Sequence, residues 1–85
     1  MNDEDRKYDI SVYKAMPYKM VLEYDSDYRV WFIRFPDLPG CLAHGKTPQE
    51  AVNMGLKAKD EWLQATHERG WPIPMPREQE KGGEG

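Results

Sequence analysis

The stretch that decides the fold reads FPDLPGCLAHGKTPQEA and runs from Phe35 to Ala51. Its final part predicts the start of a helix, with Thr47 as the N-cap residue. Pro48 suits the first helical position, because the N–H that proline lacks would have no helical partner there. Glu50, three residues after the cap, can accept a hydrogen bond from the backbone N–H of Thr47. We therefore expect a helix that begins at Pro48.

Gly40 to Thr47 also matches GxxxxGKT, the phosphate-binding loop of many nucleotide hydrolases. In that loop the lysine and threonine lie at the start of a helix whose free N–H groups face the phosphates. Here the helix would occupy the hydroxyl of Thr47, and Pro48 lacks one N–H that a phosphate would need. Too few residues follow Thr47 for the crossover connections of the parallel sheet that carries such a loop. We interpret the match as accidental.

The chain has 85 residues, which is one small domain whose core is marginal and which is therefore prone to form oligomers. The formal net charge is −3 and no basic cluster occurs, so direct binding to nucleic acid is disfavoured and a basic protein partner is favoured. Cys41 is the single cysteine and is expected to be a small buried residue. No apolar run is long enough to span a membrane, and the acidic N-terminus is unlike a signal peptide. We expect a cytoplasmic protein.

A hairpin is predicted before the deciding stretch. Alternation of apolar and polar residues from Tyr18 to Asp25 predicts a half-buried strand, and Asp25-Ser26-Asp27 predicts a short turn. Tyr28 to Phe35 predicts a second, antiparallel strand. One face of it carries Trp31, Ile33 and Phe35, and the other carries Tyr28, Val30 and Phe32.

The rest of the chain predicts one more strand and one long helix. Pro36 and Pro39 interrupt the strand ladder, and residues 41–45 predict a short third strand. The helix should run from Pro48 to about Arg69. Its Gly55 costs about 1 kcal/mol relative to alanine, which favours a close approach of helix and sheet. The predicted fold class is α+β, a three-stranded antiparallel sheet packed on one long helix.

Three regions are expected along the chain. Residues 1–16 would form an N-terminal arm that is partly helical, residues 17–76 the folded domain, and residues 77–85 a disordered charged tail. A single helix covers only one face of the sheet, although both faces of the second strand are apolar. We therefore expect an exposed apolar patch, which is typical of an interface, and a homo-oligomer, either a dimer or a tetramer. The candidate interface residues are Tyr28, Val30, Trp31 and Phe32.

Residues 17–76 resemble the HicB-like antitoxins. The resemblance is carried by Tyr18, Tyr28, Trp62-Leu63, the segment 73–76, and ten motif residues in the deciding stretch. These ten are Pro36, Asp37, Leu38, Pro39, Gly40, Cys41, Gly45, Thr47, Glu50 and Ala51. The resemblance implies a β-β-β-α core like part of the ribonuclease H fold. It also implies a protein that neutralises a small mRNA-cleaving toxin, HicA, by covering its active surface.

Two features depart from the family pattern. Position 46 is commonly acidic in the family and is Lys46 here, which changes the local charge beside the helix start. Many members continue into an operator-binding domain after the proline-rich segment, but this sequence ends nine residues after Pro76, and we do not expect it to bind operator DNA.

The leading hypothesis is a non-enzymatic antitoxin that acts on a small basic HicA-like toxin without any cofactor. One alternative is a stand-alone oligomeric domain of this fold with a partner other than a toxin. A weaker alternative is a metal-dependent nuclease built from the carboxylates of Glu23, Asp25, Asp27 and Asp37. Aspartates in turns are ordinary turn formers, and the two histidines and one cysteine lack zinc-site spacing, so we expect no catalytic or metal site.

Overall fold

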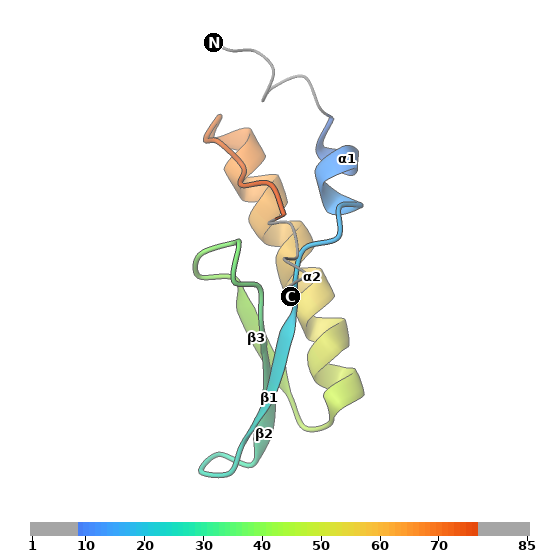
Figure 1. The fold of residues 1–85 in the computed structure, drawn as a ribbon, viewed down its shortest axis with the longest axis vertical. Helices are drawn as coiled ribbons and strands as arrows, with labels where there is room; N and C mark the ends of the chain where they lie inside the picture. The colour runs from blue at the N-terminus through green and yellow to red at the C-terminus, as the bar shows by residue number, and fades with distance from the viewer. Residues whose placement is uncertain (1–8, 77–85) are drawn as a thin grey trace, which may run out of the picture.

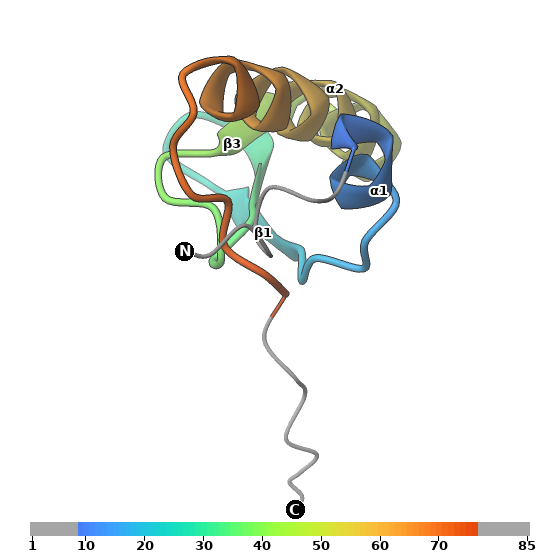
Figure 2. The ribbon, with the colours of Figure 1, turned by 90° about the horizontal axis from the view of Figure 1, so that it is seen from above.

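The computed structural model describes residues 9–76. Its elements are α1 (Ile10–Lys14), β1 (Val21–Asp25), β2 (Val30–Arg34), β3 (Leu42–Gly45) and α2 (Pro48–Glu68). The strands form one antiparallel sheet in the order β1-β2-β3, and α2 lies along one face of it (Figure 1). The view from above shows α1 beside α2 (Figure 2). The predicted α+β fold, with three antiparallel strands and one long helix, is confirmed.

The hairpin turn between β1 and β2 is longer than predicted. The carboxylate of Asp25 accepts hydrogen bonds from the backbone N–H groups of Asp27, at 2.9 Å, and Tyr28, at 3.1 Å. These bonds hold Tyr28 in the turn, so β2 begins at Val30 rather than at Tyr28. The first strand is likewise shorter than predicted and begins at Val21.

The proline-containing turn between β2 and β3 contributes to the core. The N–H of Leu38 donates to the carbonyl of Phe35, and the N–H of Cys41 donates to the carbonyl of Leu38, both at 2.9 Å. This path directs Leu38 inward, where its side chain is fully buried. The indole Nε1 of Trp62 donates to the carbonyl of Pro39 at 2.9 Å, which fixes the turn to α2. The turn is therefore a packed part of the fold.

The helix start follows the predicted capping pattern with one difference. The hydroxyl of Thr47 accepts a hydrogen bond from the N–H of Glu50 at 3.0 Å, and Pro48 is the first helical residue. The carboxylate of Glu50, however, accepts from the N–H of Lys46 at 2.6 Å instead of from the N–H of Thr47. Glu50 thus reaches one residue further back than the capping box predicts, and it secures the link between β3 and α2.

Two glycines bring α2 close to the sheet. A Cβ atom on Gly55 would lie 2.6 Å from Cγ2 of Ile33 in β2. A Cβ atom on Gly45 would lie 2.5 Å from the backbone nitrogen of Ala51 in α2. No larger residue fits at either position without a shift of its neighbours. The close approach predicted from Gly55 is confirmed, and β3 contributes to it through Gly45.

Because α2 contacts β2 and β3 at these glycines, β1 receives little cover. Met20, Leu22 and Tyr24, which the alternation predicts to be the buried side of the first strand, are 47%, 37% and 52% exposed. The alternation assigns the faces correctly, but it does not show which strands a single helix covers. The prediction of a half-buried first strand is therefore wrong for these three side chains.

The largest buried cluster lies beside the sheet, where α1, the turn after β2 and the C-terminal half of α2 meet. Its members are Tyr13, Tyr18, Phe35, Leu38, Cys41 and Leu63. Tyr13 belongs to α1, so the core extends before residue 17, where the folded domain is predicted to begin. The hydroxyl of Tyr18 donates to the carbonyl of Pro74 at 2.6 Å, which holds the segment after α2 against this cluster.

Burial changes two ionisable groups of the core. It raises the pKa of Tyr18 to about 12, with smaller contributions from Tyr13 and Asp37. It also raises the pKa of the Cys41 thiol to about 11, and nearby Lys59 partly opposes this shift. Both groups are therefore neutral in the folded protein at physiological pH.

Replacing the cap residue should destabilise the protein while replacing its neighbour should not. Thr47→Ala leaves the N–H of Glu50 without its acceptor, and we expect the free energy of unfolding to fall by about 1 kcal/mol. Lys46→Ala is the matched control, because its backbone N–H still binds Glu50, and it should change stability by less than about 0.5 kcal/mol. Urea unfolding of both variants tests this, and equal losses would contradict the assigned cap.

Gly55→Ala should destabilise the protein although alanine is the better helix former. The added methyl group meets Ile33, and we expect a loss of about 1–3 kcal/mol in the free energy of unfolding from overpacking. Lys57→Ala, on the exposed side of the same helix, should be neutral or slightly stabilising. A stabilising Gly55→Ala in the same denaturation assay would show that helix and sheet are further apart.

The raised pKa values of Cys41 and Tyr18 predict a loss of stability at alkaline pH. Each group keeps its proton in the folded chain above the pH at which the unfolded chain releases it. The unfolded state then binds fewer protons, so stability falls as pH rises from about 9 to about 12. The free energy of unfolding, measured across this range, should decline less steeply with pH than in the wild type. The difference should extend up to pH about 11 in Cys41→Ala and up to pH about 12 in Tyr18→Phe. An unchanged slope in both variants would refute the assignment.

Candidate protein-interaction surface

The sheet face opposite α2 has no helix over it in the described chain. Ile33 points to Gly55 of α2, so its neighbours Phe32 and Arg34 point to the opposite face. The register of the strands then assigns the other side chains of what we call the open face. Its members are Val21, Glu23, Asp25, Val30, Phe32, Arg34, Leu42 and His44.

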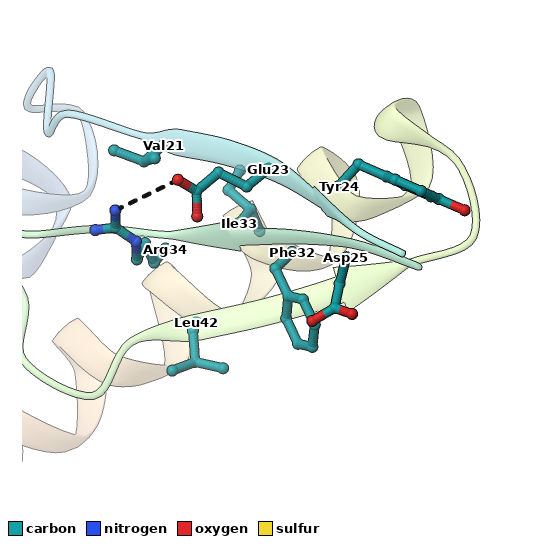
Figure 3. A pocket seen from close by; sticks show the side chains of 8 residues that line it. All are labelled: Val21, Glu23, Tyr24, Asp25, Phe32, Ile33, Arg34 and Leu42. Carbon is teal, nitrogen blue, oxygen red and sulfur yellow. Dashed lines mark ion pairs between the residues drawn. The ribbon is translucent and has the colours of Figure 1, made fainter. Parts of the chain in front are cut away.

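The open face combines apolar and charged groups around a shallow hollow. The hollow measures about 350 Å³ and is lined by residues of all three strands (Figure 3). Leu42 is 55% exposed beside it. Glu23 and Arg34 form an ion pair across the hairpin at 3.9 Å, and both side chains remain solvated, so the pair adds little stability. These charges are available to a partner.

The structure brings together two of the four candidate interface residues. Val30 and Phe32 are half-buried on the open face, and the ring of Phe32 meets His44 edge-on at 5.7 Å between centroids. Trp31 lies on the α2 side of the sheet, where its ring is 5.3 Å from that of Tyr24. Tyr28 is exposed in the hairpin turn. The open face therefore contains Val30 and Phe32, and Tyr28 and Trp31 lie elsewhere.

The sequence pattern also missed Val21 and Leu42 as members of this surface. Leu42 and His44 alternate with Ala43 and Gly45 in β3. Such an alternation over four residues is a weak signal. It becomes informative once Gly45 is known to face α2, because Leu42 and His44 must then face away.

The ten motif residues serve the fold. Leu38 and Cys41 belong to the buried cluster, and Gly45 lies against Ala51 at the start of α2. Thr47 and Glu50 cap that helix. Gly40 has a φ of +81°, a left-handed conformation that favours glycine, and it ends the turn. Pro36, Asp37 and Pro39 lie earlier in the same turn. The motif thus describes how the turn, β3 and α2 are joined.

The phosphate-loop match has a different structure from a phosphate-binding loop. Residues 42–45, at the centre of the match, form β3 rather than a loop. The hydroxyl of Thr47 is engaged by the N–H of Glu50. This arrangement agrees with the interpretation of the match as accidental.

Two of the carboxylates considered for a nuclease have structural partners. Asp25 accepts turn hydrogen bonds and Glu23 pairs with Arg34. Among residues 9–76, no three His, Cys, Asp or Glu side chains are grouped so that they could hold a metal ion. Cys41 is buried as predicted, and its raised pKa keeps the thiol protonated, whereas the thiolate is the nucleophilic form. Neither helix of the described region is long and apolar enough to cross a membrane.

Comparison with known proteins gives one match. The family model described as the HicB-like antitoxin of bacterial toxin–antitoxin systems matches residues 18–82. No curated protein and no solved structure matches the chain. The matched range covers the sheet, the motif turn, α2 and the segment after it, so it confirms the resemblance predicted for residues 17–76. The chain belongs to the HicB-like antitoxin family of bacterial toxin–antitoxin systems.

Proposed function

We propose that this protein is a non-enzymatic antitoxin that neutralises a small, basic, HicA-like mRNA-cleaving toxin by direct contact in the cytoplasm. The observation that carries the proposal is the family match over residues 18–82. The structure of residues 9–76 supports it in two ways. Polar groups such as those of Asp25, Thr47 and Glu50 form helix caps and turns, and one face of the sheet has no helix over it. Inhibition by such a protein requires only that it cover the toxin surface.

The toxin would dock on the open face. Phe32 and Leu42 provide apolar area, and Glu23 and Asp25 provide negative charge beside it. Apolar side chains surrounded by charged groups are the usual composition of a protein interface. The exposed Glu23–Arg34 pair is weak in solvent, so little is lost if Glu23 exchanges Arg34 for a cation of the partner.

Charge would favour the encounter of the two proteins. The chain has a formal net charge of −3, and a toxin that binds RNA is expected to be basic. Opposite net charges raise the association rate, and added salt screens this effect. By the same reasoning, we propose that the chain does not itself bind nucleic acid.

We further propose that the protein is a homo-oligomer. Within residues 9–76 the buried hydrophobic cluster has six members, and Met20, Leu22 and Tyr24, in and directly before β1, remain exposed on the α2 side of the sheet. Small domains with limited cores often gain stability by association.

A charge on the open face should abolish toxin neutralisation. In Leu42→Lys, the new ammonium group would face a basic partner in an apolar contact, and we expect at least about a tenfold loss of affinity. Folding should be retained because Leu42 is already exposed. Met54→Lys is the matched control, since Met54 is 45% exposed on α2 and lies outside the open face.

The assay is co-expression with a small basic chain encoded beside this one, with growth arrest as the readout and calorimetry of the purified pair for affinity. The wild type and Met54→Lys should relieve the arrest, and Leu42→Lys should not. Persistent arrest with soluble, folded wild type would reject the antitoxin function and favour a stand-alone domain with another partner. Relief by Leu42→Lys would keep the function but reject the open face as its surface.

A further inference from the structure

Among residues 9–76, no strand pairs with the outer edge of β1, so its outward backbone hydrogen-bonding groups are free in this part of the chain. Successive residues of a strand direct their N–H and C=O groups to alternate sides. The N–H of Phe35 donates to Cys41 beside β3, so the backbone groups of Arg34 and Phe32 point toward β1, where their register partners are Val21 and Glu23. The groups of Leu22 and Tyr24 therefore point away from β2, along the outer edge of the sheet.

Exposed apolar side chains accompany these groups. Met20, Leu22 and Tyr24 share the α2 side of the sheet, and each is at least 37% exposed. Proteins usually protect an edge strand with lysine, proline or a bulge. β1 contains neither lysine nor proline, and its register with β2 is continuous. Its two acidic side chains lie on the open face, so they do not interrupt the apolar side of the edge.

We propose that β1 of a second copy of this chain pairs antiparallel with this edge, about a twofold axis at Leu22. This inference rests on the homo-oligomer proposed above and assigns its interface. The register sets Leu22 against Leu22 of the second copy, and Met20 against its Tyr24. All side chains on the α2 side of the junction are then apolar.

The charges of the strand favour pairing centred on Leu22 over pairing centred on the next residue, Glu23. Extending the pairing by one residue at each end sets Lys19 of each copy against Asp25 of the other, so two pairs of opposite charge flank the centre. Antiparallel pairing centred on Glu23 would also use the free groups of Leu22 and Tyr24. It would, however, oppose Glu23 to itself, and like charges directly opposite each other are destabilising. The segment from Lys19 to Asp25 is therefore complementary to itself about Leu22.

The resulting dimer leaves the open face accessible. A twofold axis perpendicular to the sheet joins two three-stranded sheets edge to edge and keeps both α2 helices on one side. Both open faces then lie together on the other side. Self-association would thus centre on the edge and toxin binding on the open face. Asp25 would contribute charge to both, whereas Leu22 and Leu42 belong to one surface each, so one contact can be lost without the other.

The first test compares two leucine-to-lysine variants of the full chain by analytical ultracentrifugation. The wild type should sediment as a dimer of the 10.0 kDa chain. Leu22→Lys places two ammonium groups opposite each other at the axis and should weaken the dimer at least about tenfold. Leu42→Lys, at the other edge strand, should leave the dimer unchanged, and circular dichroism should show both variants folded. A monomeric wild type, or a dimer lost in Leu42→Lys but kept in Leu22→Lys, would overturn the proposal.

The second test fixes the register through disulfide formation. Directly opposed Cα atoms in a hydrogen-bonded antiparallel pair lie about 5.5 Å apart, within the range of a disulfide. Leu22→Cys should therefore form a covalent dimer under mild oxidation, whereas Glu23→Cys, which lies opposite Val21 of the second copy, should not. The native Cys41 is buried and does not compete. Preferential cross-linking of Glu23→Cys would overturn the Leu22 register, and toxin neutralisation by the same proteins is scored separately.

Discussion

The close approach of α2 to β2 and β3 at Gly55 and Gly45 is the constraint on which the rest of the structure depends. It exists because neither position carries a side chain where the two layers meet. The hydrogen bonds of Thr47 and Glu50 then set where the helix begins and how it leaves β3. With the helix fixed over these two strands, β1 stays largely uncovered, and the buried cluster forms where α1 and the turn after β2 meet α2. The exposed edge and the position of the core thus have one cause.

This cause explains how much of the fold the sequence could predict. The role of Thr47 and the pairing of the hairpin strands depend on neighbours in the chain, and both were predicted. The role of Gly55 was also predicted, because a glycine inside a helix indicates one close contact. The burial of Tyr13 and the exposure of Leu22 depend on where distant elements come to rest, which no local pattern contains. The hairpin turn was misjudged because Asp25 binds the N–H of Tyr28 as well as that of Asp27, so the turn extends beyond the predicted Asp25-Ser26-Asp27.

The interaction surface was predictable in outline only. Apolar residues on both sides of the second strand indicated that one face would be uncovered, and Phe32 lies there. The hollow on that face also depends on Leu42 and on the Glu23–Arg34 pair, which require the register of three strands. In a chain this small, the separation of an uncovered face from an uncovered edge would let one thin sheet serve the two proposed contacts. The proposed toxin binding and self-association would then have separate affinities.

The hydrogen bond from Tyr18 to Pro74 joins residues 56 positions apart in the chain. Within the sheet and α2 the connections are short, because the strands follow one another and α2 begins directly after β3. The contact of α1 with α2 is also distant in the chain, since Lys59 donates to the carbonyl of Lys14 across 45 positions. Chains dominated by local contacts fold rapidly, and the cost of closing a long loop delays contacts between distant residues. We therefore expect the segment after α2, like α1, to dock after the sheet and α2 have formed. By the same reasoning, we expect both to open before the sheet and α2, as units of low local stability at the rim of a more cooperative core.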